Sequence, residues 1–139
     1  MGKSTAAYIV NNNQLLLLLR DNIPTISDPN KWDTPGGGVE GEESYEECLI
    51  RELVEELELN LGSSRLIYLW ESITPKGNTE HSYLIKISEF EKSSLILHEG
   101  QKMEFFSFDS LAKLELTKHL QNVYLLKGQN IREVLFGKI

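Results

Sequence analysis

Apolar residues near the start of the chain predict two strands joined by a tight turn. Residues 6–10 are mainly apolar, and residues 14–20 include an unbroken run of leucines. Between them stands Asn11-Asn12-Asn13, and asparagine tolerates the left-handed conformations that turns require. The leucine run predicts a strand buried on both faces, because a half-solvated strand would alternate apolar with polar residues. A loop over residues 21–31 and a short strand over residues 32–34 are expected to follow.

The clearest helical pattern begins after Ser44 and extends to about Leu57. Ser44 and Glu47 have the spacing of a capping box, in which each satisfies the other's backbone at a helix start. An apolar stripe at helical spacing predicts a buried face. The stripe consists of Cys48, Leu49, Leu53 and Leu57. An acidic face adjoins it, so this helix can pack inward and still present carboxylates to a cleft.

The second half of the chain predicts further strands and two helices. Residues 65–73 and 81–87 are expected to form a hairpin around the turn signal Thr74-Pro75-Lys76-Gly77-Asn78. Residues 102–108 predict a strand, Asp109-Ser110 a short helix and residues 117–126 a longer one. Residues 95–97 and 131–136 receive no assignment. Strands mixed with helices favour a layered α/β (α+β) arrangement.

Length and charge limit the possible functions. The chain has 139 residues, which predicts a single domain over residues 1–139. Its net charge of −7 argues against non-specific binding of nucleic acid or of anionic membranes, which need basic surface. Phosphate groups remain accessible to such a protein if a metal ion bridges the two charges.

Cysteine content and hydropathy bear on location. Cys48 is the single cysteine, so no internal disulfide can form, and a reducing, cytoplasmic compartment is expected. A small core residue is the preferred role for this thiol. No signal peptide is expected, and the leucine run is too short to span a bilayer.

Three glutamates concentrate the candidate chemistry on one helical face. Glu52, Glu55 and Glu56 stand at positions i, i+3 and i+4, so their side chains are neighbours. Without a partner they repel one another, and the nearby helix end disfavours negative charge. A divalent cation would remove both penalties, and hard oxygen ligands favour Mg²⁺ or Mn²⁺. A solvated, charged helix remains the alternative, with pairs worth only about 0.2–0.5 kcal/mol each.

The residues around these glutamates resemble the signature of the Nudix hydrolases. That signature is G-x5-E-x7-R-E-U-x-E-E-x-G-U, with U apolar, and here it begins at Gly37 and ends at Leu59. Glu43, Arg51 and the three glutamates occupy its charged positions. Glu58 replaces the late glycine, so Asn60 or Gly62 is expected to make the turn that ends the helix.

The resemblance implies a fold, a reaction and a cofactor. The fold would be a Nudix-type α/β/α sandwich with a central mixed β-sheet. The reaction would be hydrolysis of a nucleoside triphosphate or a nucleoside diphosphate derivative, with Mg²⁺ or Mn²⁺. Glu52 and Glu56 would be the first metal ligands and Glu55 a further ligand or catalytic group. Arg51 would orient a carboxylate, with Glu43 as its local partner.

Other site residues are nominated by their setting. Family members often draw a further acid from a loop after the signature, and Glu99 resembles that acid as a base or additional ligand. A solvated loop glutamate is the equal alternative. Arg20 could contact a phosphate, although a solvated strand end also explains it. Gly37 and Gly38 could bring backbone close to substrate. Trp32, Tyr68 and Trp70 could stack on a base, but such aromatics more often lie in a core.

Alternative functions remain open at this stage. Pro75 stands sixteen residues after Leu59, as a proline does in some ADP-ribose pyrophosphatases, so hydrolysis of ADP-ribose or of a nucleotide sugar is the runner-up. Proline is common in turns, which explains it equally well. A non-catalytic nucleotide-binding module is disfavoured because all three glutamates are present. Charge disfavours a decapping enzyme, and a homodimer is left open.

Overall fold

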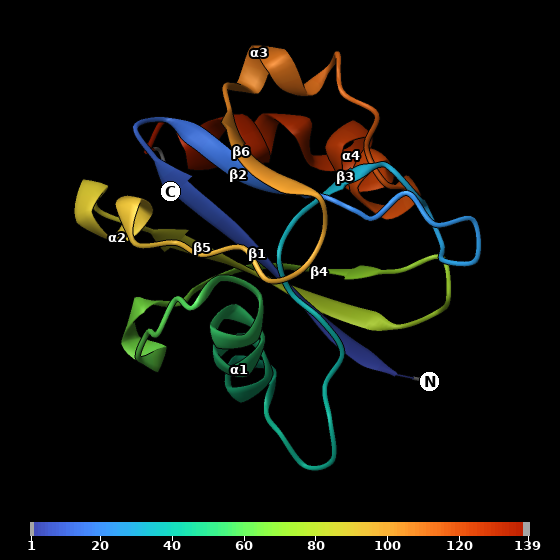
Figure 1. Ribbon diagram of the computed structural model, residues 1–139, viewed down its shortest axis with the longest axis horizontal. Coiled ribbons are helices and arrows are strands. Elements are labelled where there is room, and N and C mark those ends of the chain that lie inside the picture. Colours follow the sequence, from blue (N-terminus) through green and yellow to red (C-terminus); the bar gives the residue numbers. More distant parts are fainter. Residues whose placement is uncertain (1, 138–139) are drawn as a thin grey trace.

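A mixed sheet lies between α1 on one side and α3 and α4 on the other (Figure 1). The protein is seen in a computed structural model that describes residues 2–137, so the predicted domain of residues 1–139 extends past the described residues at both ends. The strands are β1 Lys3–Asn11, β2 Gln14–Leu19, β3 Trp32–Asp33, β4 Ile67–Ile73, β5 Thr79–Lys86 and β6 Lys102–Phe106. The helices are α1 Tyr45–Leu57, α2 Glu89–Ser93, α3 Phe108–Leu111 and α4 Lys118–Leu135, with a 3₁₀ turn at Ser63–Arg65.

The two faces of the sheet bury separate hydrophobic clusters. Tyr8 packs in the cluster under α4, whereas its neighbour Ile9 packs in the cluster under α1. The leucines of β2 divide in the same way, because successive strand residues point to opposite faces. Leu15 and Leu17 lie on the α4 side, and Leu16 and Leu18 lie on the α1 side. The predicted burial of this run on both faces is therefore confirmed.

A gap opens where β1 and β2 diverge. The two strands pair only at the hairpin, through Val10 with Leu15 and Asn11 with Gln14. β1 then continues parallel to β5, and β2 continues antiparallel to β6. β3 pairs with the far end of β2, and the chain then crosses to β1, where Ala7 N–H donates to Pro35 O at 2.8 Å. The chain thus crosses between the two halves of the sheet before Pro35, and the glycine run lies along β1, where Thr5 N donates to Gly37 O at 2.8 Å.

The boundaries of α1 agree with the sequence, but its termination differs. Ser44 and Glu47 form the predicted capping box, and the helix ends at Leu57. Glu58 itself adopts the left-handed conformation, with φ 53° and ψ 31°. Its N–H bonds to Val54 O at 3.0 Å. The expectation that Asn60 or Gly62 would take this turn was wrong, because the backbone bonds of the helix end hold a non-glycine residue there at a modest cost.

Several other boundaries differ from the prediction. β1 extends from Lys3 instead of starting at residue 6, and the strand after the 3₁₀ turn begins at Ile67 instead of residue 65. α2 was not predicted. α4 extends to Leu135 through a non-helical residue, Lys127, and so includes most of the unassigned segment 131–136. No helix of the described chain, α4 included, is long and apolar enough to cross a membrane.

Candidate active site

Glu56 is a buried carboxylate at the gap between the strands. Glu56 as a whole is only 5% exposed, and its Oε1 accepts a hydrogen bond from Gly36 N at 2.9 Å. Burial raises its pKa to about 8 against the opposing effect of that hydrogen bond, and the nearby Glu99, Glu52 and Asp33 carboxylates raise it further. An acid in this position is poorly stabilised as an anion by the protein alone.

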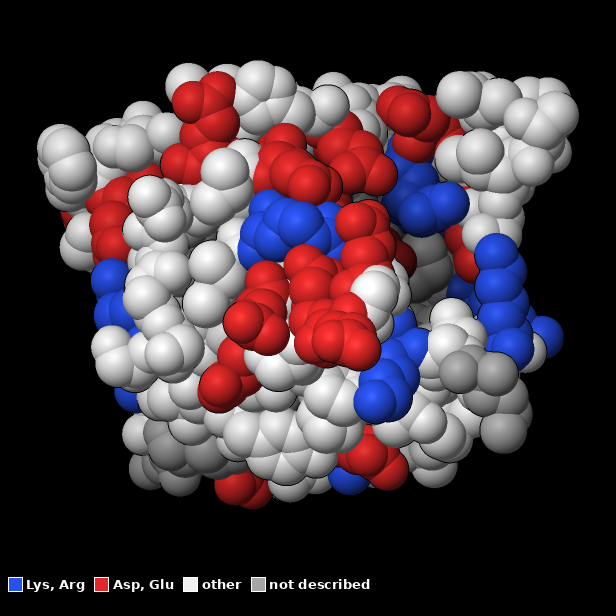
Figure 2. All heavy atoms as spheres, turned by 90° about the horizontal axis from the view of Figure 1, so that it is seen from below, with Lys and Arg blue, Asp and Glu red and all other residues white. Residues whose placement is uncertain are grey.

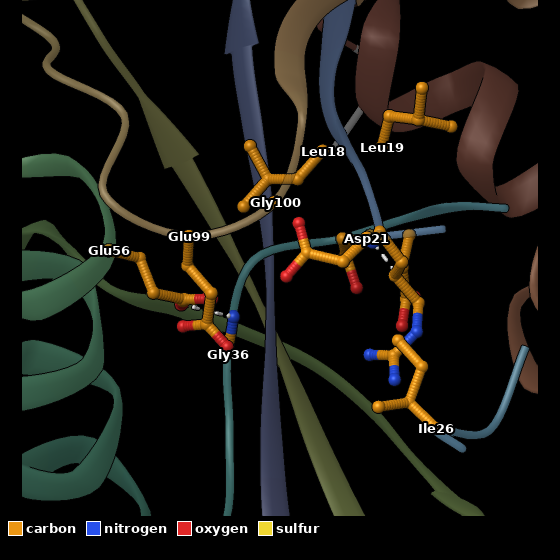
Figure 3. Close-up of a pocket in the computed structure, with 11 residues that line it drawn as sticks. Leu18, Leu19, Asp21, Ile26, Gly36, Glu56, Glu99 and Gly100 are labelled. Atoms are coloured by element: carbon orange, nitrogen blue, oxygen red, sulfur yellow. Dashed lines mark hydrogen bonds between the residues drawn. The ribbon is translucent and has the colours of Figure 1, made fainter. Parts of the chain in front are cut away.

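Backbone hydrogen bonds on both sides of Glu99 hold its loop beside Glu56. His98 N donates to Glu56 O at 2.8 Å, which ties the loop to the end of α1. Gln101 N donates to Leu19 O at 2.8 Å, which ties the other side of the loop to β2. Figure 3 shows the Glu56 and Glu99 side chains close together beside Gly36. The structure therefore brings the predicted downstream acid to the signature helix.

Arg51 joins the remaining carboxylates of the cluster. Its guanidinium makes two bonds to Glu43, of 2.6 and 3.0 Å, and lies 3.1 Å from Glu52 Oε1 and 3.3 Å from Glu55 Oε1. The pairing with Glu43 was predicted, and it lowers the pKa of that carboxyl to about 2. Figure 2 shows acidic side chains crowded around a basic one on the face that carries α1.

The three signature glutamates have unequal environments. The Glu52 side chain is 14% exposed and the Glu55 side chain 57%, whereas Glu56 is buried. The expected crowding of all three on one face is thus relieved, because Glu55 turns to solvent beside Arg51. Arg51 lines neither of the hollows described below, so the geometry gives it a positioning role rather than contact with a substrate.

Two of the three glycines in the run lie very close to neighbouring groups. Gly36 has φ +140°, and a Cβ there would lie 2.1 Å from Thr5 O. A Cβ on Gly37 would lie 2.4 Å from the Glu52 carboxyl carbon. A Cβ on Gly38 would meet nothing within 4 Å. Packing against backbone therefore requires a glycine at Gly36, whereas a side chain at Gly37 would displace the flexible end of Glu52 and one at Gly38 would meet nothing.

Two hollows meet at this loop. One, of about 220 Å³, contains Glu56 and Glu99 and is called the acidic pocket here. The other, of about 420 Å³, extends past Gly37 and Gly38 to the turn containing Pro75 and is called the groove. Arg20 lines both. The structure therefore places Arg20, Gly37 and Gly38, the residues expected to contact substrate through phosphate or backbone, on these two surfaces.

The aromatic candidates lie elsewhere. Trp32 and Trp70 are buried in the cluster under α4, and Tyr68 packs at the edge of a cluster with His81 and Tyr83. None of these three residues, which were considered for stacking on a base, lines the acidic pocket or the groove. The sequence-based preference for a core role is confirmed for the two tryptophans.

Sequence reasoning missed two polar groups in the groove. Asp33 lines both hollows, and burial raises its pKa to about 6 despite a 2.8 Å bond from Thr34 N. Glu80 pairs with His119 at 2.9 Å, and this bond raises the pKa of the imidazole. The place of Asp33, three residues before Gly36, was the available signal. The Glu80–His119 pair depends on contact between β5 and α4, which no local pattern reveals.

The donor set fits a divalent cation. Glu52 and Glu56 both have a raised pKa, and burial is the largest cause for each. A dication would stabilise their anionic forms and offset their mutual repulsion. As the side chains stand, no group of three or more His, Cys, Asp or Glu residues in residues 2–137 is gathered closely enough to hold a metal. Side-chain movement on binding is therefore expected, and the metal site stays a prediction.

Alanine at two adjacent glycines should have opposite consequences. Gly37→Ala is expected to push the Glu52 carboxylate aside and to weaken divalent-cation affinity by about tenfold or more. Gly38→Ala adds the same methyl group to open space and should leave affinity unchanged. Calorimetric titration with Mg²⁺ and Mn²⁺ measures both. Equal affinities in the two variants would contradict a metal-binding role for the Glu52 carboxylate in the position that it occupies here.

Comparison with known proteins identifies the family. A family model described as the NUDIX domain matches residues 2–126, which is most of the chain. The chain belongs to the Nudix family. The predicted family is confirmed, and so is the predicted fold class, a mixed sheet between helices.

Relatives of this Nudix domain are named for different activities. An m7GpppN-mRNA hydrolase of Danio rerio is 45% identical over 74 residues, covering 50% of this chain and 25% of that protein. A diphosphoinositol polyphosphate phosphohydrolase of Homo sapiens is 29% identical over 101 residues, covering 71% of this chain and 56% of that protein. The matched part of this Nudix chain thus spans about a quarter of the first relative and just over half of the second.

A solved structure supports the Nudix fold over 98% of the chain. The structure of MutT reported for Aliivibrio salmonicida and Vibrio cholerae matches with a TM-score of 0.71 and covers 98% of each chain. Its sequence identity is 18%, so the likeness concerns the fold alone.

Proposed function

We propose that this Nudix domain is a metal-dependent pyrophosphohydrolase. It would cleave the diphosphate linkage of a nucleoside triphosphate or of a nucleoside diphosphate derivative, with Mg²⁺ or Mn²⁺. The observation that carries the proposal is the buried Glu56 facing Glu99 in a pocket at the signature helix. Family membership supports the reaction class, and the differing activities of the relatives leave the substrate to be chosen from the site itself.

Each residue of the site has a proposed role. Glu52 and Glu56 would hold the cation, and Glu55 would join them directly or through water. The cation would supply charge neutralisation at the diphosphate and a lower pKa for bound water. Glu99 would act as base or additional ligand, since it lines the pocket beside Glu56. Arg51 positions Glu52 through a 3.1 Å bond. Arg20, where the two hollows meet, would contact a phosphate oxygen.

A second candidate is a pyrophosphatase for ADP-ribose or a nucleotide sugar. Pro75 lines the groove, so the residue that suggested this substrate lies within reach of its far end. A decapping activity, for which the Danio rerio relative is named, is less favoured, because a chain of net charge −7 offers little general attraction to RNA. A cytoplasmic location, consistent with the single buried Cys48, is part of the same proposal.

A phosphate-release screen tests the proposed function. The purified protein is incubated with Mg²⁺ and nucleoside triphosphates, ADP-ribose, sugar nucleotides, dinucleoside polyphosphates and diphosphoinositol polyphosphates. At least one compound should be cleaved at its diphosphate, and the pattern should identify the leaving group. Specific binding of a nucleotide with no cleavage of any compound would favour a non-catalytic module and overturn the proposal.

Glu99→Gln should lower turnover, by about tenfold to a hundredfold, and less than Glu56→Gln. The amide keeps the size of the side chain but removes its charge and basicity. The measurement is kcat against pH for both variants and the wild type. A loss equal to that of Glu56→Gln, with the loss of a basic limb in the pH profile, would make Glu99 the principal base. Wild-type rates in Glu99→Gln would show that Glu99 is a solvated loop residue with no part in catalysis.

A further inference from the structure

Glu58 has an unusual backbone conformation at the end of α1. Among residues 2–137, the non-glycine residues with positive φ are Asn12, Asn13, Asp28, Asn30 and Glu58. Asparagine and aspartate adopt this conformation more easily than other residues with a side chain, so only Glu58 in this group lacks that reason. A glycine, which the Nudix signature has at this position, would adopt the same φ of 53° without strain. A strained residue next to a candidate site directs attention to what its side chain contacts.

The Glu58 side chain contacts His98, the residue directly before Glu99. Glu58 Oε2 lies 2.5 Å from His98 Nε2. An ionised carboxylate only accepts hydrogen bonds, so the imidazole is the donor. The two residues are 40 apart in the sequence. The contact therefore joins two separate segments, the end of α1 and the loop that carries Glu99.

The backbone of the same loop also lies along the end of α1. Ile96 N donates to Leu57 O at 3.0 Å, and His98 N donates to Glu56 O at 2.8 Å. Both carbonyls belong to the last turn of the helix, where carbonyl groups have no partner within the helix. The loop is thus attached to the turn that carries Glu56, and the Glu58 side chain adds a bond at the last residue before Glu99.

The chain after Glu99 is attached to the end of β2. Gly100 has φ +93°, and a Cβ there would lie 2.6 Å from Leu19 O. Gln101 N donates to that same oxygen at 2.8 Å, and Gln101 Nε2 donates to Arg20 O at 2.8 Å. Glu99 therefore lies on a short connection between two attached segments.

Like charges act against this position of Glu99. The carboxylates of Glu52 and Glu56 lie close enough to Glu99 to interact with its charge, and Figure 3 shows Glu99 directed toward Glu56. Mutual repulsion favours a Glu99 that moves away from these groups. Contacts that hold the loop against α1 oppose that movement.

We propose that Glu58 is a positioning residue for Glu99. Under the proposed function, on which this assignment rests, Glu99 acts as base or additional ligand. The Glu58 carboxylate holds His98 and thereby fixes the start of the connection that carries Glu99 beside Glu56. Glu58 lines neither the acidic pocket nor the groove, so it acts through the loop and not on the substrate. This role explains why a glutamate ends the helix where a glycine would be unstrained.

Glu58→Gly separates positioning from a purely structural role. Glycine suits the left-handed conformation, so the urea midpoint should stay level or rise. The kcat should nevertheless fall by about threefold to fivefold with little change in KM, because a contact between exposed side chains is weak but acts on Glu99. Glu58→Gln keeps an oxygen that can accept from His98 and should retain most of the wild-type kcat. As the control, Asn12→Gly replaces a left-handed residue in the β1–β2 turn and should leave kcat unchanged.

A double variant shows whether the contact is the cause. If Glu58 acts through His98, then Glu58→Gly combined with His98→Ala should lower kcat no further than the more severe single change. Losses that multiply in the double variant overturn the proposal. Wild-type kcat in Glu58→Gly overturns it as well.

Hydrogen exchange tests the hold on the loop without turnover. The His98 amide, which bonds to Glu56 O, should exchange faster in Glu58→Gly than in the wild type and at the wild-type rate in Asn12→Gly. Unchanged exchange in Glu58→Gly overturns the positioning role even if the enzyme is active. Faster exchange in a protein that cleaves no diphosphate shows instead that the proposed function fails while the hold on the loop is real.

Discussion

Glu56→Gln is expected to lower turnover by about a hundredfold to a thousandfold while the fold remains intact. The estimate follows from the loss of one charged ligand, since metal ions stabilise a transition state by several kcal/mol and each 1.4 kcal/mol is about tenfold in rate. The amide oxygen can still accept the hydrogen bond from Gly36 N that Glu56 Oε1 accepts now. The substitution therefore removes the charge and preserves the packing.

The comparison needs a control on the same helix. Glu46→Gln makes the same chemical change at an exposed position of α1 that makes no ion pair within the described residues. Its kcat should equal that of the wild type. Urea unfolding of both variants checks the fold, and metal titration checks the ligand role. Wild-type turnover in Glu56→Gln would remove this residue from the ligand set.

Gly36→Ala is expected to destabilise the protein by about 3 kcal/mol or more. The added Cβ would lie 2.1 Å from Thr5 O, a backbone atom that cannot move without disturbing β1. The residue also has φ +140°, which L-residues rarely adopt. Strain of this kind costs about 1–3 kcal/mol, and forced overpacking about as much again. Because domains are stable by only about 5–15 kcal/mol, the loss is large.

Chemical denaturation measures the effect of Gly36→Ala. Gly38→Ala is the matched control, since its Cβ would meet nothing within 4 Å, and its free energy of unfolding should stay within about 1 kcal/mol of the wild type. Failure of Gly36→Ala to accumulate as folded protein agrees with the expected loss. Equal stabilities of the two variants would show that the glycine loop can leave β1 at little cost.

Local signals predicted the parts of the fold that local chemistry determines. The capping box of Ser44 and Glu47 fixed the start of α1, and the apolar stripe fixed its face and its end at Leu57. The leucine run of β2 indicated burial on both sides because such a run suits no half-exposed strand. The signature residues indicated the family, and Arg51 met the expected partner Glu43.

The remaining features depend on contacts between distant segments. α4 contains one non-helical residue, Lys127. Its last part buries Ile131, Val134 and Leu135 against the sheet, and no local sequence signal predicted a helix there. Glu55 turns to solvent although its helical spacing matches its neighbours, because Arg51 offers it a partner there. The divergence of β1 and β2, which creates the site, follows from the pairing of each with a strand far along the chain.

Divalent-cation dependence of turnover is the most direct test of the account. Hydrolysis of the substrate selected by the screen is measured in excess chelator and then with Mg²⁺ or Mn²⁺ restored. Because the proposed mechanism needs a cation between the diphosphate and the carboxylates of the acidic pocket, turnover should vanish in chelator and return with the metal. Full turnover in excess chelator would contradict the claim that these carboxylates act by holding a cation against the diphosphate.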